Sequence, residues 1–141
     1  MIYADSSALV RVYLDEPRSN EVRALMTGNL AIASTELAYV EVRAALAAAQ
    51  RRGRINDEEL TSLKAGFEAW WPQVIEIQTD ASLLKRAGDL AEYGSLRGYD
   101  AMHLAAAERL KLGGINNLHF LCFDQELVRA AKMLGIACAD L

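Results

Sequence analysis

The chain has 141 residues, of which 52% are hydrophobic and 24% charged, and it carries a formal net charge of −4. This length and composition predict one globular domain spanning residues 1–141, large enough to bury a real core. The negative net charge excludes a polycation that binds nucleic acid over its whole surface, although a local basic patch could still contact RNA.

Strand-like and helix-like segments alternate through the first half of the chain. In order, we expect a buried strand over 2–5, a helix opened by Ser6 and Ser7, a helix over 20–26, a strand over 30–33 and a helix over 36–50. Pro17 ends the first helix because proline has no backbone N–H to donate. Ser19 is a suitable N-cap for the second helix, and Ser34 or Thr35 for the third.

The same alternation continues through the second half. In order, we expect a helix from 56 to about 71, a strand over 74–77, a helix from 80 to about 92, a helix from 99 or 100 to 110, a strand over 118–123, a helix over 125–134 and a strand over 136–139. Asn56 and Glu59 have capping-box spacing, and Pro72 blocks continuation of the helix that they begin. This alternation predicts an α/β fold with a mostly parallel sheet covered on both faces.

Four acidic residues occupy positions where a small α/β domain does not ordinarily place a charge. Asp5 ends the apolar run 1–4, Glu41 lies inside the apolar helix pattern 37–46, Asp100 precedes the run 101–107, and Asp124 ends the run 120–123. Carboxylates are rarely buried without a partner, because removing their charge from water is costly. Ligand sites in parallel sheets lie beyond the carboxyl ends of strands, where Asp5 and Asp124 are expected. If the four acids converge, a divalent cation would relieve their repulsion.

Helix geometry selects Glu41 over Glu36 as the acid that faces the interior. The two are five residues apart, about 140° around a helix at roughly 100° per residue, so they cannot both point at one site. Glu36 lies in the first turn, where the helix dipole favours an acid without any other role. His103 follows Asp100 by three residues and could approach the same site, but a hydrogen-bonded buried histidine is the simpler interpretation.

An oxygen-only ligand set favours Mg²⁺ or Mn²⁺ over zinc. Such an ion can activate a water for in-line attack on phosphorus and stabilise the leaving oxygen, which is what phosphodiester hydrolysis requires. The structural alternative is that Asp5, Asp100 and Asp124 only cap helices, and that Glu41 is a partly exposed helix acid.

Two other residues are candidates to support the acids. Ser7 can hydrogen-bond to a carboxylate, and Arg97, in a predicted loop, can contact phosphate or offset the acidic charge. The one tight basic cluster, Arg51, Arg52 and Arg54, is best explained as a solvated helix end.

Membrane and export signals are absent from the sequence. No stretch approaches the roughly 20 apolar residues that span a bilayer, and the start lacks the basic and apolar regions of a signal peptide. Cys122 and Cys138 lack zinc-ligand spacing, and we expect both to be buried free thiols. These features predict a cytoplasmic protein with no membrane partner.

Four motifs occur in a recognisable order. They are Asp5-Ser6-Ser7-Ala8-Leu9-Val10, then Glu41 in a mid-chain helix, then Leu96-Arg97-Gly98-Tyr99-Asp100-Ala101-Met102-His103-Leu104-Ala105, and finally Phe123-Asp124-Gln125-Glu126-Leu127. Together they resemble the PIN-domain ribonucleases, and most closely the VapC-type toxins of bacterial and archaeal toxin–antitoxin pairs.

The resemblance implies a three-layer α/β/α sandwich and an Mg²⁺-dependent endoribonuclease that acts as a toxin. It also implies a homodimer and a cognate antitoxin protein. The family's acidic positions match Asp5, Glu41, Asp100 and Asp124, and its small hydroxyl residue near the first acid matches Ser7. Cys122 departs from the pattern, because relatives commonly carry Thr or Ser there.

Other functions fit the sequence less well. A PIN-type nuclease for RNA processing, without toxicity, would share the same site. A non-catalytic signalling receiver needs paired acids after the first strand and an Asp after a central strand, but Asp5 stands alone and Ile77 is followed by Gln78. A haloacid-dehalogenase-like phosphatase needs a second Asp where this chain has Ser7.

The predicted helix over 56–71 carries an apolar stripe. Its members are Leu60, Leu63, Phe67 and either Trp70 or Trp71. We expect this stripe to form part of a dimer or antitoxin surface.

Overall fold

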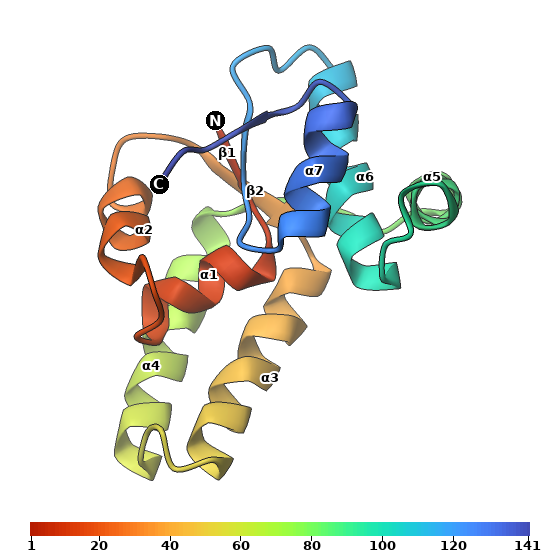
Figure 1. Cartoon of the computed structure of the whole chain (residues 1–141). Coiled ribbons are helices and arrows are strands. Elements are labelled where there is room, and N and C mark those ends of the chain that lie inside the picture. The colour runs from red at the N-terminus through yellow and green to blue at the C-terminus, as the bar shows by residue number, and fades with distance from the viewer.

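The computed structural model describes residues 1–141 and contains one central five-stranded sheet (Figure 1). Its strands are β1 (Ile2–Ala4), β2 (Ile32–Thr35), β3 (Ile75–Ile77), β4 (His119–Leu121) and β5 (Ala137–Cys138), in the spatial order β3-β2-β1-β4-β5. Every neighbouring pair is parallel, which confirms the predicted sheet. The chain winds from β1 toward β3 and then returns to the other side of β1, so the winding direction changes between β1 and β4.

Helices cover both faces of the sheet. They are α1 (Ser6–Tyr13), α2 (Ser19–Met26), α3 (Leu37–Arg51), α4 (Asp57–Trp70), the 3₁₀ turn η1 (Trp71–Gln73), α5 (Ala81–Gly94), α6 (Gly98–Leu112) and α7 (Gln125–Met133). The helices α1 to α4 contribute to one apolar core, and α5 to α7 contribute to the other. The three-layer α/β/α sandwich is therefore confirmed.

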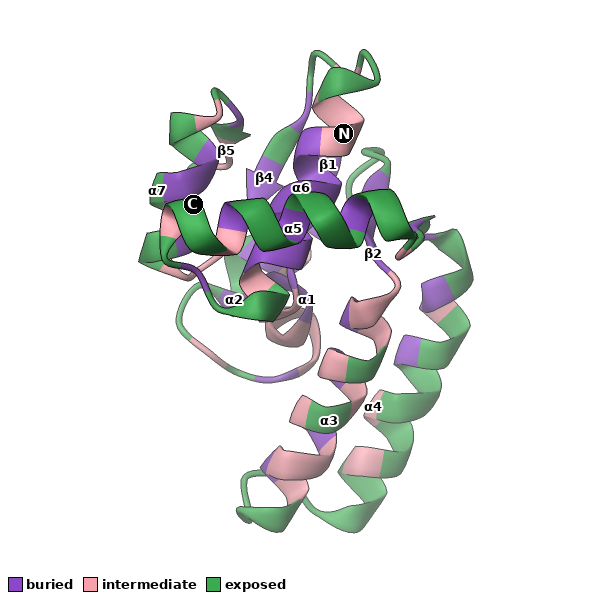
Figure 2. Cartoon of the chain, turned by 90° about the vertical axis from the view of Figure 1, so that its right-hand side faces the viewer, coloured by how far each residue is buried: buried purple, intermediate pink, exposed green.

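Successive side chains of β1 pack alternately into the two apolar cores. Ile2 and Ala4 pack with the α1–α4 side, whereas Tyr3 packs with the α5–α7 side. Because successive side chains of a strand point to opposite faces, this strand joins the two layers. Helix α6 is buried continuously over residues 101–108 and lies between the sheet and the more exposed α5 (Figure 2).

The second strand lies further along the chain than predicted. Ser34 and Thr35 are fully buried strand residues and do not cap the next helix. The Ser34 hydroxyl donates to the carbonyl oxygen of Ala4 at 2.7 Å, and Thr35 pairs with Ile77 of β3. Pairing with both neighbours thus overrides the capping preference of these residues.

The helices α3 and α4 form a hairpin that extends away from the sheet (Figure 1). The predicted capping box is present, since Glu59 N donates to the Asn56 side chain and Asn56 N donates to that of Glu59. Phe67 is 0% exposed and lies against three aromatic rings of the same chain, those of Tyr13, Tyr39 and Trp71. The apolar stripe is therefore used largely for packing within the chain, and its role in a dimer or antitoxin surface stays a prediction.

Two further expectations concern the thiols and the membrane. Both cysteines are free, but each is only half-buried, because Cys122 lies beyond the end of β4 and Cys138 lies in the edge strand β5. The prediction that they are buried is thus wrong. No helix combines the length and apolar character that crossing a bilayer requires.

Candidate active site

A polar pocket of about 430 Å³ lies beyond the carboxyl ends of β1 and β4. Its lining consists of Asp5, Ser6, Ser7, Arg11, Glu41, Arg97, Tyr99, Asp100, Phe123 and Asp124. All six predicted site residues are in this set. The pocket occupies the place where the winding of the sheet changes direction, which is where open parallel sheets usually bind ligands.

Asp5 caps α1 and also lines the pocket. Its carboxylate accepts from Ala8 N at 2.9 Å and from the Ser7 hydroxyl at 2.7 Å, and the residue is 4% exposed. Burial raises the pKa of Asp5 above its ordinary value, while the neighbouring His103 and the hydrogen bond from the Ser7 hydroxyl act in the opposite direction. The capping role and the predicted site role therefore coexist in one carboxylate.

Glu41 reaches the pocket from α3, the helix that follows β2. Asp124 instead follows β4, the strand on the opposite side of β1. Its Oε2 lies 2.8 Å from His103 Nε2, and His103 is 2% exposed. Glu36 instead points elsewhere, since its Oε1 accepts from Thr79 N at 2.9 Å. The choice of Glu41 over Glu36 is confirmed as a matter of geometry, and so is the expectation that His103 is buried and hydrogen-bonded.

Arg97 joins the remaining two acids. Its Nε donates to Asp100 Oδ2 at 2.9 Å, and a terminal nitrogen donates to Asp124 Oδ2 at 3.3 Å. Asp124 also caps α7 by accepting from Leu127 N at 3.0 Å. The Cys122 thiol takes part in the same turn, where it accepts from Asp124 N at 3.3 Å. The cysteine therefore supports the local hydrogen bonding that a hydroxyl residue would otherwise provide.

The chemistry of the pocket fits a hard divalent cation, although each acid already has a protein partner. No group of three or more His, Cys, Asp or Glu side chains is arranged to hold a metal ion as the side chains stand. Arg97 bridges Asp100 and Asp124, and His103 lies within hydrogen-bond distance of Glu41. The acidic donors of the lining are carboxylates, with no Cys or His among them, and this set suits Mg²⁺ or Mn²⁺. The assignment of the four acids as metal ligands stays a prediction.

Four lining residues were not predicted as site residues from the sequence: Ser6, Arg11, Tyr99 and Phe123. The Arg11 guanidinium lies 3.8 Å from the centre of the Phe123 ring and donates to the Ser7 carbonyl oxygen at 2.7 Å. Arg11 follows Ser7 by four residues, so helical spacing could have placed both on one face. Tyr99 is 63% exposed beside Asp100, and an exposed aromatic ring there can stack on a base.

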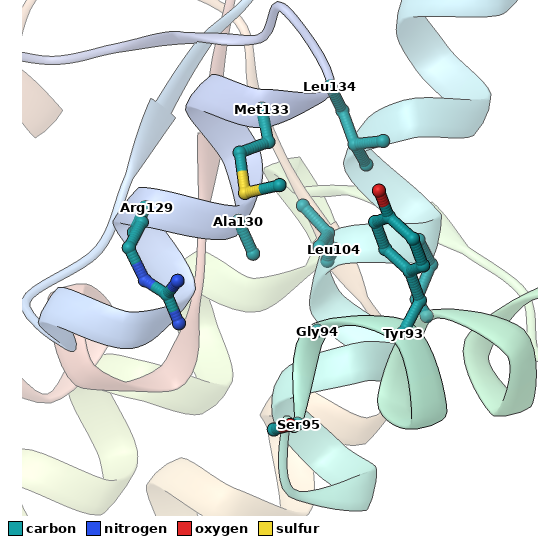
Figure 3. Close-up of a pocket in the computed structure, with 9 residues that line it drawn as sticks. Tyr93, Gly94, Ser95, Leu104, Arg129, Ala130, Met133 and Leu134 are labelled. Carbon is teal, nitrogen blue, oxygen red and sulfur yellow. The ribbon is translucent and has the colours of Figure 1, made fainter.

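A second cavity, of about 140 Å³, lies between the end of α5, α6 and α7 (Figure 3). Six of its nine lining residues are hydrophobic, among them Tyr93 and Met133, and none carries a carboxylate. Its lining therefore lacks the acids on which the predicted chemistry depends.

Several known proteins resemble this chain in sequence. The family model for the PIN domain matches residues 2–133. Ribonucleases VapC45 and VapC49 of Mycobacterium tuberculosis are each 40% identical to this chain over 139 residues, which is 99% of this chain and 94% of each relative. Ribonuclease VapC46 of the same organism is 34% identical over 136 residues, which is 96% of this chain and 94% of the relative.

Two solved structures share the architecture. FitAcB from Neisseria gonorrhoeae superimposes with a TM-score of 0.70 at 15% identity, over 99% of this chain and 97% of that one. VapC20 of M. tuberculosis, described as a toxin that cleaves the sarcin–ricin loop, gives a TM-score of 0.65 at 16% identity, over 92% of this chain and 95% of its own. At these identities the two structures support the fold alone.

Proposed function

This chain belongs to the PIN-domain family and within it to the VapC-type ribonucleases, and we propose that it is an Mg²⁺-dependent endoribonuclease that acts as the toxin of a toxin–antitoxin pair. Mn²⁺ would substitute for Mg²⁺ in the same oxygen-ligand site. The observation that carries the proposal is the gathering of Asp5, Glu41, Asp100 and Asp124 around one pocket at the carboxyl edge of a parallel sheet.

The four acids would hold the metal beyond the carboxyl ends of β1 and β4. A divalent cation in such a site supplies an activated water and stabilises the charge that develops on phosphate oxygens. Asp5 is oriented by Ser7 and by the first turn of α1, and Glu41 is oriented by His103. These two carboxylates are held in place before metal binds, whereas Asp100 and Asp124 must first be released from Arg97.

The remaining lining residues suit an RNA backbone. Arg11 and Arg97 place two guanidinium groups at the pocket, where they can bind phosphate oxygens. Tyr99 adds an exposed aromatic surface for an unpaired base. These local features allow a chain with a net charge of −4 to bind a polyanion at one place.

We propose two protein partners, an antitoxin and a second copy of this chain. A cognate antitoxin would neutralise the enzyme by covering the pocket, and a basic side chain near the acids would substitute for the metal charge. We also propose that the chain forms a homodimer. Size-exclusion chromatography with light scattering at micromolar concentration tests the dimer, and a monomer as the sole species would refute it.

The first experiment compares purified antitoxin-free protein with Asp5→Asn and Asp100→Asn on total RNA, in Mg²⁺, Mn²⁺ or chelator. We expect the wild-type chain to cleave RNA only with metal, and both variants to lose cleavage while retaining their circular dichroism spectra. Full activity in either folded variant would overturn the site assignment. Cleavage by the wild-type chain in chelator would overturn the metal dependence.

A further inference from the structure

Two buried residues outside the pocket lining form a hydrogen-bonded chain that ends on Glu41. We propose that Tyr3 and His103 are positioning residues that fix the Glu41 carboxylate toward the metal-binding pocket. The inference rests on the proposed function, because it takes Glu41 to be a metal ligand.

The chain leads from the centre of the sheet to the pocket. The Tyr3 hydroxyl lies 3.0 Å from His103 Nδ1, and His103 Nε2 lies 2.8 Å from Glu41 Oε2. Tyr3 is 0% exposed and His103 is 2% exposed, whereas the Glu41 side chain is 25% exposed. Only the last member therefore reaches solvent, and the first two lie in the core.

The direction of these hydrogen bonds follows from the acceptor. An ionised carboxylate can only accept, so His103 Nε2 must carry a proton and donate to Glu41. In a neutral ring, Nδ1 then accepts from the Tyr3 hydroxyl, and that contact selects this tautomer. The Tyr3 hydroxyl is therefore the donor in this contact, because Nδ1 carries no proton in this tautomer.

Packing holds both rings in place. Tyr3 stacks on Phe120 of β4 with ring centres 5.5 Å apart, and it meets the His103 ring edge-on at 6.0 Å. The contact thus joins β1 to α6, and His103 extends it to Glu41 on α3. Since α6 also carries Asp100, one helix places one acid directly and orients a second through its histidine.

His103 donates a hydrogen bond to Glu41, and residues that hold a metal ligand through such a bond fix its orientation. Such partners restrict the rotamers of a ligand, and their loss typically weakens metal binding about 10- to 100-fold. Glu41 needs this restraint because its long side chain would otherwise sample several rotamers at the pocket edge.

Two substitutions of His103 separate the two hydrogen bonds. In His103→Gln the amide nitrogen can occupy the position of Nε2, so it can still donate to Glu41. In His103→Asn the shorter amide lies near the position of Nδ1, so it can reach Tyr3 but not Glu41. Tyr3→Phe removes only the hydroxyl and keeps the stacked ring.

The measurement is Mn²⁺ affinity of the full chain by calorimetry, with circular dichroism to confirm folding. We expect a roughly 10- to 100-fold loss in His103→Asn, a smaller loss in His103→Gln and a severalfold loss in Tyr3→Phe. In a Glu41→Gln background, the His103→Asn substitution should have no further effect, because its action runs through that carboxylate.

The outcomes separate this inference from the proposed function. If the wild-type chain binds no Mn²⁺, or if Asp5→Asn binds it equally well, the proposed site itself fails. If the wild type binds, Asp5→Asn does not, and both Tyr3→Phe and a folded His103→Asn bind like the wild type, only the positioning role is overturned. An equal loss of Mn²⁺ affinity from His103→Asn in the wild-type and Glu41→Gln backgrounds would also overturn the positioning role. Should His103→Asn not fold, Tyr3→Phe alone and in the Glu41→Gln background decides the question.

Discussion

At the scale of single residues, two acids of the pocket also have a structural role. Asp5 and Asp124 cap helices through one oxygen while they line the pocket. A cap by itself accounts for a surface aspartate, but it does not account for Asp5, whose charge is buried. A buried charge that weakens the fold is typical of a residue retained for function.

Asp5→Asn should therefore stabilise the metal-free protein at neutral pH. The pKa of Asp5 is raised in the folded state, so the folded protein binds this proton more tightly than the unfolded chain does. The resulting loss of stability is absent below the ordinary pKa, grows as pH rises through the raised value, and is complete above it. Asparagine keeps a cap acceptor but carries no charge.

Thermal unfolding in chelator, at several pH values, tests whether Asp5→Asn stabilises the protein. The variant should unfold at a higher temperature than the wild type near pH 8, and the difference should shrink as the solution is acidified toward the ordinary carboxyl pKa of about 4. A variant that is less stable at pH 8, or a difference that does not depend on pH, would contradict the assigned role of burial.

Arg97→Gln should strengthen metal binding and weaken RNA cleavage. The guanidinium bridges Asp100 and Asp124, so a cation must displace it from both. The Arg97 side chain is 80% exposed, and exposed ion pairs are weak because water screens them, so we expect at most a fewfold gain in Mn²⁺ affinity. Cleavage should fall, because Arg97 would no longer be available to bind phosphate.

Arg11→Gln is the matched control for that experiment. Arg11 lines the same pocket, but its hydrogen bonds go to the backbone carbonyl oxygens of Ser7 and Pro17. Its removal should reduce RNA binding without a comparable gain in metal affinity. An equal gain in both variants would show that general charge, rather than the Arg97 bridge, controls the metal.

At the scale of elements, the α3–α4 hairpin holds Glu41 in place through an aromatic cluster. Phe67 lies at its centre and contacts the rings of Tyr13, Tyr39 and Trp71. Glu41 and Tyr39 lie two residues apart on α3, so the cluster and the pocket share one helix. Packing of α4 against α3 therefore supports the site from a distance.

Phe67→Ala should lower the free energy of unfolding by about 3–5 kcal/mol, because it removes a fully buried ring. Leu63→Ala, on the same helix face but only half-buried, should cost much less. Chemical denaturation of both variants gives the comparison. Similar costs for the two would indicate that the cluster is not the centre of the hairpin core.

At the scale of the whole molecule, the fold brings acids from two helices and from beyond the ends of two strands to the carboxyl edge of the sheet. Winding that changes direction between β1 and β4 opens this edge, and helices from both layers border it. Like charges that gather there repel one another, and on the proposed function a cation bound between them would relieve this repulsion. Metal binding and folding should accordingly be coupled.

Mg²⁺ or Mn²⁺ should raise the unfolding temperature in a saturable way. A ligand that binds only the folded state stabilises it by about 2.7 kcal/mol at 100 times its dissociation constant. Asp100→Asn should lose most of this increase, while Asp80→Asn, an acid that caps α5 away from the pocket, should keep it. An equal increase in wild type and Asp100→Asn would place the metal elsewhere.

The sequence alone determined which segments become strands and helices, and the order of the four acids along the chain. Periodicity and capping motifs are local, so Asn56 with Glu59 and the run before Asp5 could be interpreted without the fold. The tertiary structure decided what depends on distant contacts. It extended β2 through Ser34 and Thr35, where the Ser34 hydroxyl donates to Ala4 of β1 and Thr35 pairs with Ile77 of β3.

The partners of the acids were likewise decided only by the tertiary structure. His103 meets Glu41 across 62 residues, and Arg97 meets Asp124 across 27, distances over which no local pattern specifies a hydrogen bond. Arg11 and Tyr99 enter the pocket for the same reason. The sequence supplies the charges, but packing of helices on both sides of one parallel sheet determines which charges meet.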